Sequence, residues 1–241
     1  MNAGLLALGG TTTLPPPGQA PGVYQGAAEV IAALMLLLEF GMLRQALVRD
    51  QVRLYAAQSA MISALAVIIA ADRNLPDLYA LAALSAALKV FAVPLVLRRL
   101  LGPPAVEETR GVAGSYTLSP ASAVLASIVL AAFGFFCFGS LGIRSASVPA
   151  LALSIAGAMM FVAFALMIVR RDVASQAIGF FSLENAISLA SLVLAAELPL
   201  LLETAFLFDL LLAVVVFGML IRAHHSRADS LSTSDLTRLR G

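Results

Sequence analysis

The chain of 241 residues is 61% hydrophobic and only 12% charged, with a formal net charge of +1 and a mean hydropathy of +0.96. Soluble domains average about 45–50% apolar and about 25% charged residues, so this chain has too little polar surface for a water-facing exterior. The composition excludes a soluble enzyme, a nucleic-acid-binding protein and a secreted disulfide scaffold. It predicts an all-α, polytopic membrane helix bundle whose surroundings are the lipid bilayer. Cys137, the single cysteine, has no partner for an internal disulfide and lacks the neighbours of a metal site.

Seven apolar runs of about 20 residues, the length that crosses a bilayer core of about 30 Å, follow one another along the chain. They are continuous rather than alternating and are rich in Ala and Leu, which indicates helices. We expect a short extracytoplasmic lead over 1–26, a seven-helix membrane domain over 27–222 and a tail over 223–241. The predicted spans are 27–48, 53–71, 78–99, 120–140, 148–169, 174–196 and 201–222.

The distribution of Lys and Arg predicts the orientation, because positive residues are retained on the cytoplasmic side. Only Arg73 and Arg144 fall on the other side of the predicted membrane, and Lys89 lies within a span. The N-terminus is therefore predicted outside and the C-terminus inside. The twelve cations on the inner side are Arg44, Arg49, Arg53, Arg98, Arg99, Arg110, Arg170, Arg171, Arg222, Arg227, Arg238 and Arg240.

Spans one to three and five to seven share one orientation, and a weak repeat relates them at an offset of 122–123 residues. Arg49-Asp50 aligns with Arg171-Asp172, and Leu75-Pro76 aligns with Leu198-Pro199. Chance matches are expected among so many Ala and Leu residues. Both a duplication and chance remain open.

Four ionisable side chains fall near the middle of predicted spans: Glu39, Lys89, Glu184 and Asp209. A charged residue at a helix centre costs about 2.5–3.5 kcal/mol on insertion scales, so these groups should face the bundle interior at similar depth. One interpretation is structural, with Lys89 paired to a carboxylate. However, three acids against one lysine leave two without a cation, and burial favours the protonated form of a carboxyl group. The second interpretation is therefore a proton or ion path.

Pro94 interrupts the third span five residues after Lys89. Because proline has no N–H, it cannot bond to the carbonyl of Val90. A simple kink and a functional break that hydrates Lys89 are equally compatible with the sequence.

One stretch of the sixth predicted span reads Gly179-Phe180-Phe181-Ser182-Leu183-Glu184-Asn185-Ala186-Ile187-Ser188-Leu189. It resembles the middle helix of the K subunit of respiratory complex I and of the related C subunit of Mrp-type cation/proton antiporters. Glu184 then corresponds to the first membrane glutamate of those subunits. Asp209, ahead of Arg222, corresponds to the second, although it is one methylene shorter. The K-subunit-like unit spans 147–222, and the seven-helix layout is similar to component E of hydrogenase 4 type complexes.

This resemblance implies a non-catalytic membrane subunit of a redox-driven, complex I-like assembly of the membrane-bound hydrogenase type, in a bacterial cytoplasmic (inner) membrane. It implies antiporter-like and other membrane subunits as partners, and a proton or cation path through Glu184, Asp209, Lys89 and Glu39. It implies no cofactor in this subunit, since the metals of such complexes lie in the soluble arm. The sequence has no cluster-binding cysteines, no haem-ligand pair and no nucleotide-binding loop.

Two other classes are weighed against this one. A rhodopsin would also have seven helices and an outside N-terminus, but it carries its lysine on helix seven and its carboxylate on helix three, the reverse of Lys89 and Asp209. A free-standing secondary transporter, or an antiporter subunit of Mrp type, is the alternative. Transporter sites are usually lined by paired helix interruptions in the two halves, and only Pro94 interrupts a span here.

The charge distribution generates a prediction about topology. A reporter enzyme that is active only in the periplasm should stay silent when it is fused after Gly241, because the tail carries inner-side arginines. Activity of that fusion would invert the orientation and would place Arg170 and Arg171 outside.

Overall fold

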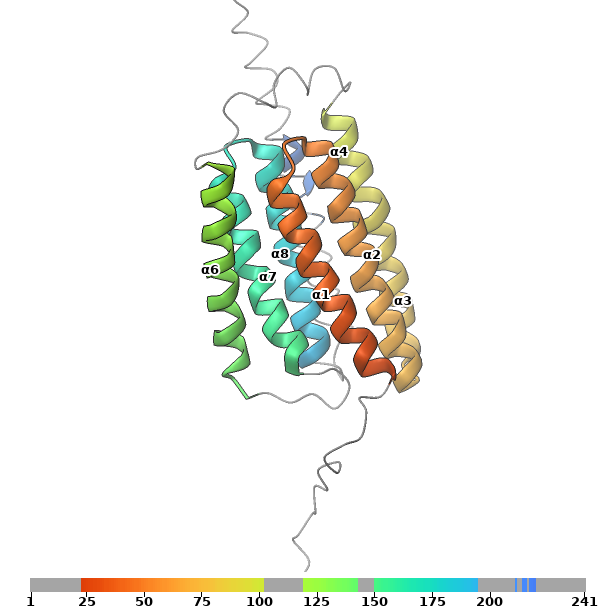
Figure 1. Cartoon of the computed structure of the whole chain (residues 1–241). Coiled ribbons are helices and arrows are strands. Elements are labelled where there is room, and N and C mark those ends of the chain that lie inside the picture. The colour runs from red at the N-terminus through yellow and green to blue at the C-terminus, as the bar shows by residue number, and fades with distance from the viewer. Residues whose placement is uncertain are drawn as a thin grey trace, which may run out of the picture.

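The computed structural model describes residues 23–101, 119–142 and 150–194, together with residues 211, 214–215 and 217–219 of the last predicted span. Within these residues the protein is a bundle of long helices that run roughly parallel and antiparallel to one another, without strands (Figure 1). The helices are α1 (Val23–Arg44), α2 (Val48–Arg73), α3 (Pro76–Ser85), the π-helix η1 (Ala86–Ala92), α4 (Val93–Leu101), α6 (Pro120–Gly139), α7 (Ala150–Val169) and α8 (Val173–Leu194).

Six helical segments in this described part are long and apolar enough to cross a membrane. They are α1, α2, the continuous run formed by α3, η1 and α4, and then α6, α7 and α8. The prediction of an all-α, polytopic membrane bundle is confirmed. The seventh predicted span, 201–222, is helical at the few positions that the structure describes there.

The first two predicted spans were displaced along the chain. Helix α1 begins at Val23 and ends at Arg44, where the sequence predicted 27–48. Helix α2 begins at Val48 rather than at residue 53. The connection between them is therefore only residues 45–47, and the polar residues Arg49, Asp50 and Arg53 belong to the first turns of α2. Apolar composition located the membrane-embedded part, whereas the helix continues beyond it into polar residues.

The helix ends carry the residues that their geometry requires. Asn74 ends α2 in the left-handed conformation with φ 54°, and Pro76 starts α3 in the first turn, where a missing N–H has no cost. Ser119 caps α6 by accepting a hydrogen bond from the backbone N–H of Ser122 at 3.2 Å. Asp172 caps α8 in the same way through Ser175 at 2.7 Å. These caps separate helices that composition alone would have merged.

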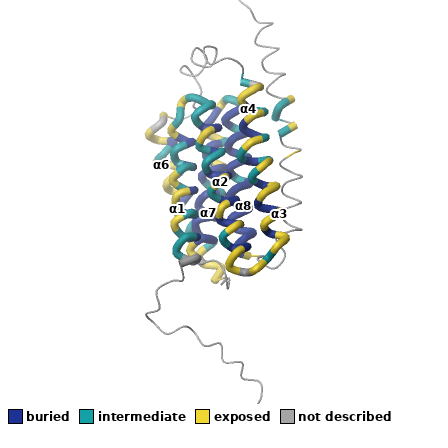
Figure 2. The backbone as a smooth tube through the Cα atoms, turned by 90° about the vertical axis from the view of Figure 1, so that its right-hand side faces the viewer, coloured by how far each residue is buried: buried dark blue, intermediate teal, exposed yellow. Residues whose placement is uncertain are grey.

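Four helices, α1, α2, α7 and α8, form the centre of the bundle. Helix α1 packs on α2 and α7, and α8 packs on α7 and α2. Figure 2 shows the buried positions concentrated along these helices, whereas α6 and α3 carry many exposed positions. The exposed apolar side chains of α6 include Leu125, Val129, Phe133 and Phe136. The interior of the bundle is thus lined mainly by α1, α2, α7 and α8.

The connections that the sequence assigns to the inner side lie at one end of the bundle. The α1–α2 turn, the end of α4 and the α7–α8 turn lie together at one end of the bundle (Figure 1). A hydrogen bond from the guanidinium of Arg170 to the backbone carbonyl of Gln45 joins the two turns. Arg73 ends α2 at the opposite end. Residues 110, 144 and 222–240, which carry the other extramembrane cations, lie outside the described residues.

Helices α6 and α7 approach each other through glycine. A Cβ atom on Gly157 would lie 2.7 Å from the carbonyl oxygen of Gly134, and a Cβ atom on Gly134 would collide with the carbonyl oxygen of Gly157. Backbone oxygens cannot retreat without moving a helix. Membrane helices commonly use such small residues to pack closely, because no hydrophobic effect drives them together within lipid.

This contact predicts the result of a glycine substitution. Gly134→Ala and Gly157→Ala should each destabilise the protein by about 1–3 kcal/mol, as overpacking does in well-packed cores. Thermal unfolding in mild detergent measures the effect. Gly26→Ala is the matched control, because nothing lies within 4 Å of its added Cβ atom. Equal melting temperatures for Gly157→Ala and Gly26→Ala would contradict the packing argument.

Candidate functional site

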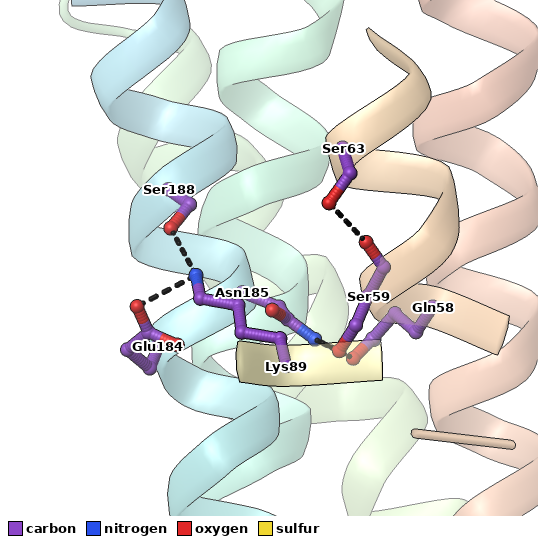
Figure 3. Close-up of polar contacts among 7 residues, drawn as sticks. All are labelled: Gln58, Ser59, Ser63, Lys89, Glu184, Asn185 and Ser188. Carbon is purple, nitrogen blue, oxygen red and sulfur yellow. Dashed lines mark hydrogen bonds and ion pairs between the residues drawn. The ribbon is translucent and has the colours of Figure 1, made fainter. Parts of the chain in front are cut away.

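A buried ion pair lies in the middle of the bundle. The Nζ atom of Lys89 is 2.7 Å from Oε1 of Glu184, and the side chains are 0% and 7% exposed. The same ammonium donates a hydrogen bond of 2.9 Å to Oγ of Ser188. Glu184 and Ser188 are four residues apart and so lie on one face of α8. Figure 3 shows the Lys89 ammonium between these two side chains.

Lys89 belongs to the π-helical turn η1, which occupies the centre of the third span. The last bond in this register runs from the N–H of Val93 to the carbonyl of Leu88. The next residue is Pro94, which has no N–H to donate to the carbonyl of Lys89. The sequence predicted an interruption at Pro94, and the structure places a widened turn immediately before it. Such π segments are frequent at functional sites.

A second polar cluster lies beside the ion pair and joins α1, α2 and α8. Oγ of Ser182 is 2.8 Å from Oε1 of Glu39 and 3.0 Å from Oε1 of Gln58. The amide nitrogen of Asn185 donates to Oε1 of Gln58 at 3.1 Å and to Oγ of Ser59 at 3.0 Å. All five side chains are buried. Three helices are thus tied together at one depth by neutral groups and one carboxyl group.

The orientation of the two amides is fixed by a backbone group. Nε2 of Gln58 donates to the carbonyl oxygen of Met35 at 3.3 Å. A carbonyl can only accept, so Oε1 of Gln58 must point the other way, toward Asn185 and Ser182. That in turn requires the NH₂ group of Asn185 to face Gln58. The cluster therefore has a defined direction of donors and acceptors.

Tyr55 connects the second cluster with the ion pair. Its hydroxyl is buried beside Ser59 and near Glu184 but makes no well-aligned hydrogen bond within the described residues. Its ring packs against Phe181 of α8 at a centroid distance of 5.9 Å. Buried polar groups without a protein partner are usually satisfied by ordered water.

The structure brings together three of the four ionisable residues that the sequence selected. Glu39, Lys89 and Glu184 lie in one polar layer that α1, η1 and α8 contribute. Asp209 lies outside the described residues. Further along its span, the described residue Phe217 packs on Phe180 and Phe181 of α8 with ring centroids 5.8 and 5.9 Å away.

Charge was the only criterion in that selection, and it missed the uncharged members of the layer. A signal for them exists, since each is a polar residue within an apolar span, and the members on one helix recur at spacings of three or four. The missed residues are Tyr55, Gln58, Ser59, Ser182, Asn185 and Ser188.

Arg170 has a different environment from the one that its place in the sequence suggested. It follows the fifth predicted span, yet it is 1% exposed. Its guanidinium binds the carbonyl of Gln45, which also accepts from Gln51 at 3.0 Å, and its own carbonyl accepts from Gln176 at 2.9 Å. Arg170 therefore fastens the α1–α2 turn to the α7–α8 turn rather than only marking the inner surface.

Within the described residues, no group of three or more His, Cys, Asp or Glu side chains could hold a metal ion. The described layer contains two carboxyl groups, an ammonium and a phenol, all of them buried.

The chain is similar to "Uncharacterized protein Rv0085" of Mycobacterium tuberculosis, with 30% identity over 177 residues that cover 71% of this chain and 77% of that protein. This chain belongs to the same family as the mycobacterial protein. No family model matches the chain, and no solved structure matches it.

The ion pair predicts non-additive effects on stability. Lys89→Met removes the ammonium that faces the buried Glu184 carboxylate, and removing one member of a buried pair costs about 3–5 kcal/mol. Adding Glu184→Gln to Lys89→Met removes both charges and should recover most of that loss. Thermal unfolding in mild detergent of the two single variants and the double variant measures the coupling.

The exposed pair of Arg53 and Asp50, 2.8 Å apart at the helix end, provides the control. Asp50→Asn should cost at most about 1 kcal/mol, since exposed pairs contribute little. Additive losses for Lys89→Met and Glu184→Gln would contradict the pairing.

Proposed function

We propose that this protein is an integral membrane subunit of a redox-driven, ion-translocating assembly related to respiratory complex I, of the membrane-bound hydrogenase type. The observation that carries the proposal is the Lys89–Glu184 pair, a charged pair buried in the middle of a membrane bundle. Ionisable residues at such depth are expensive and usually mark ion or proton paths.

The surroundings of the pair support transport over a purely structural role. Holding helices together requires only Lys89 and Glu184, yet a further carboxyl group, Glu39, is buried in the same layer. The lysine also stands on a π-helical turn before Pro94, where the backbone departs from regular hydrogen bonding. Irregular backbone at membrane depth is tolerated where it is buried in protein or lines a water-filled cavity.

In this proposal the path runs through Glu184, Asp209, Lys89 and Glu39. Glu184 and Lys89 form the central site of this path, because their charged groups lie 2.7 Å apart in the middle of the bundle. Asp209 follows from the resemblance to the K subunit. Consecutive helices are usually neighbours, so its carboxyl group is expected near Glu184.

The same proposal places the chain in a bacterial cytoplasmic (inner) membrane beside antiporter-like and other membrane subunits. No cofactor is assigned to this chain, and the electron-transfer groups belong to the soluble arm of the proposed assembly. Apolar residues such as Val129, Phe133 and Phe136 on α6 give the bundle a surface suited to lipid or to another membrane subunit.

A transporter, either free-standing or as a subunit of an Mrp-type antiporter, is the second candidate. The helix interruption at η1 and Pro94 favours it, because transporters bind ions at discontinuous helices near the midplane. Mass spectrometry of the intact, detergent-extracted assembly separates the two candidates. Redox subunits bound to the chain support the first, and antiporter subunits alone support the second.

The proposal predicts that Glu184→Gln abolishes ion pumping in membrane vesicles under substrate turnover, while assembly and soluble-arm redox activity remain detectable. The amide keeps the shape of the side chain but cannot exchange a proton. Asp209→Asn and Lys89→Met should weaken pumping similarly. Asp209→Glu should be tolerated, because it restores the residue type of the K subunit. Proton uptake or membrane potential is the measurement.

Asp72→Asn is the matched control, because Asp72 is an exposed acid at the end of α2. It should leave pumping unchanged. Full pumping by both Glu184→Gln and Asp209→Asn at wild-type subunit content would contradict the proposed path. The polar layer would then have a structural role.

A further inference from the structure

Glu39 is a buried carboxyl group that pairs with no cation among the described residues. It is 0% exposed, and no Lys, Arg or His of the described residues forms an ion pair with it. Lys89 is paired with Glu184, and Arg170 binds the carbonyl of Gln45. The Oε2 atom of Glu39 has no hydrogen-bond partner in the described part of the chain. A carboxylate in such surroundings would bear a large desolvation cost without an opposite charge to offset it.

The contacts of the Ser182 hydroxyl also disfavour an ionised Glu39, independently of its burial. Its Oγ atom is within hydrogen-bond distance of two oxygens, Oε1 of Glu39 and Oε1 of Gln58. A serine hydroxyl has one hydrogen to donate and can accept from others. If Glu39 were ionised, both neighbouring oxygens would be acceptors, and one of the two contacts would set lone pair against lone pair.

Rotating the amides does not remove this conflict. Turning Gln58 over would place its oxygen against the carbonyl oxygen of Met35, which its nitrogen now contacts at 3.3 Å. It would also place its NH₂ group against the NH₂ group of Asn185. A proton on Glu39 resolves every contact, because Glu39 then donates to Ser182 and Ser182 donates to Gln58.

We infer that Glu39 is a separate proton-binding site, held as a neutral carboxylic acid that donates to Ser182, and that the amides of Gln58 and Asn185 separate it from the Lys89–Glu184 pair. An amide oxygen accepts a hydrogen bond but takes up no proton near neutral pH. The series of hydrogen bonds from Glu39 through Ser182 therefore ends at Gln58. A proton on Glu39 is therefore not passed to Glu184 along these hydrogen bonds, and the proposed path joins the two acids by a different route.

The other ionisable groups around α1 are compatible with this site. Helix α2 carries Tyr55 in its buried part and places its charged residues Arg49, Asp50, Arg53, Asp72 and Arg73 in the turns toward its two ends. Helix α8, which reaches Glu39 through Ser182, carries Glu184, α6 carries the exposed Cys137, and α7 carries no titratable group. None of them supplies a positive charge that would favour an ionised Glu39. The inference holds whether or not the chain belongs to a redox assembly, because it concerns a proton bound by the chain itself.

Infrared spectroscopy tests the inference directly, because the carbonyl stretch of a protonated carboxylic acid is separate from the bands of a carboxylate. The sample is the full-length chain at neutral pH, purified in mild detergent with any subunits that stay bound. Glu39→Gln should remove an acid carbonyl band equivalent to one carboxyl group per chain. Asp72→Asn and Glu184→Gln, the latter removing an acid that has a cationic partner, should leave this band in place.

Ser182→Ala gives a second measurement that keeps Glu39 and does not require Glu39→Gln to fold. It removes the acceptor of the acid proton, so the acid band should keep its area and move to higher frequency. Loss of a carboxylate band instead of an acid band in Glu39→Gln would overturn the inference. An unshifted acid band in Ser182→Ala would equally overturn the assignment of Ser182 as the acceptor.

Discussion

The burial of Lys89 constrains the rest of the bundle. An ammonium at the centre of a span is tolerated only where the protein supplies an opposite charge and hydrogen-bond acceptors, and α8 supplies both through Glu184 and Ser188. The third span must therefore present its π-helical turn toward α8. Because α2 packs on both η1 and α8, its polar face is drawn into the same layer, and Gln58 and Ser59 occupy positions that would otherwise be apolar.

Two kinds of contact hold the helices together elsewhere. In the middle of the bundle, neutral hydrogen bonds from Ser182 and Asn185 join α8 to α1 and α2. At the end where the turns meet, Arg170 joins the α1–α2 turn to the α7–α8 turn. Helix α6 instead packs on α7 through Gly134 and Gly157, with no polar contribution from either residue.

The layer contains two chemically different acid sites. Glu184 faces an ammonium, whereas Glu39 faces a serine hydroxyl that also contacts an amide. Environments that separate the protonation states of two carboxyl groups are typical of sites that move protons.

The sequence by itself determined the membrane class, the approximate positions of the first six spans and the place of Glu39, Lys89 and Glu184 within them, because apolar composition and the cost of a buried charge act locally along each helix. One of the two interpretations of the sequence paired Lys89 with a carboxylate, but the sequence did not indicate that Glu184 rather than Glu39 would be the partner. That choice depends on which helix faces give close approach between residues 95 positions apart. The π-helical turn, the amide pair of Gln58 and Asn185, and the burial of Arg170 were also decided only by tertiary packing. Neutral polar residues add little to the cost of inserting any one span into the membrane, so the sequence of that span does not mark them. Their hydrogen bonds form only when the helices pack together.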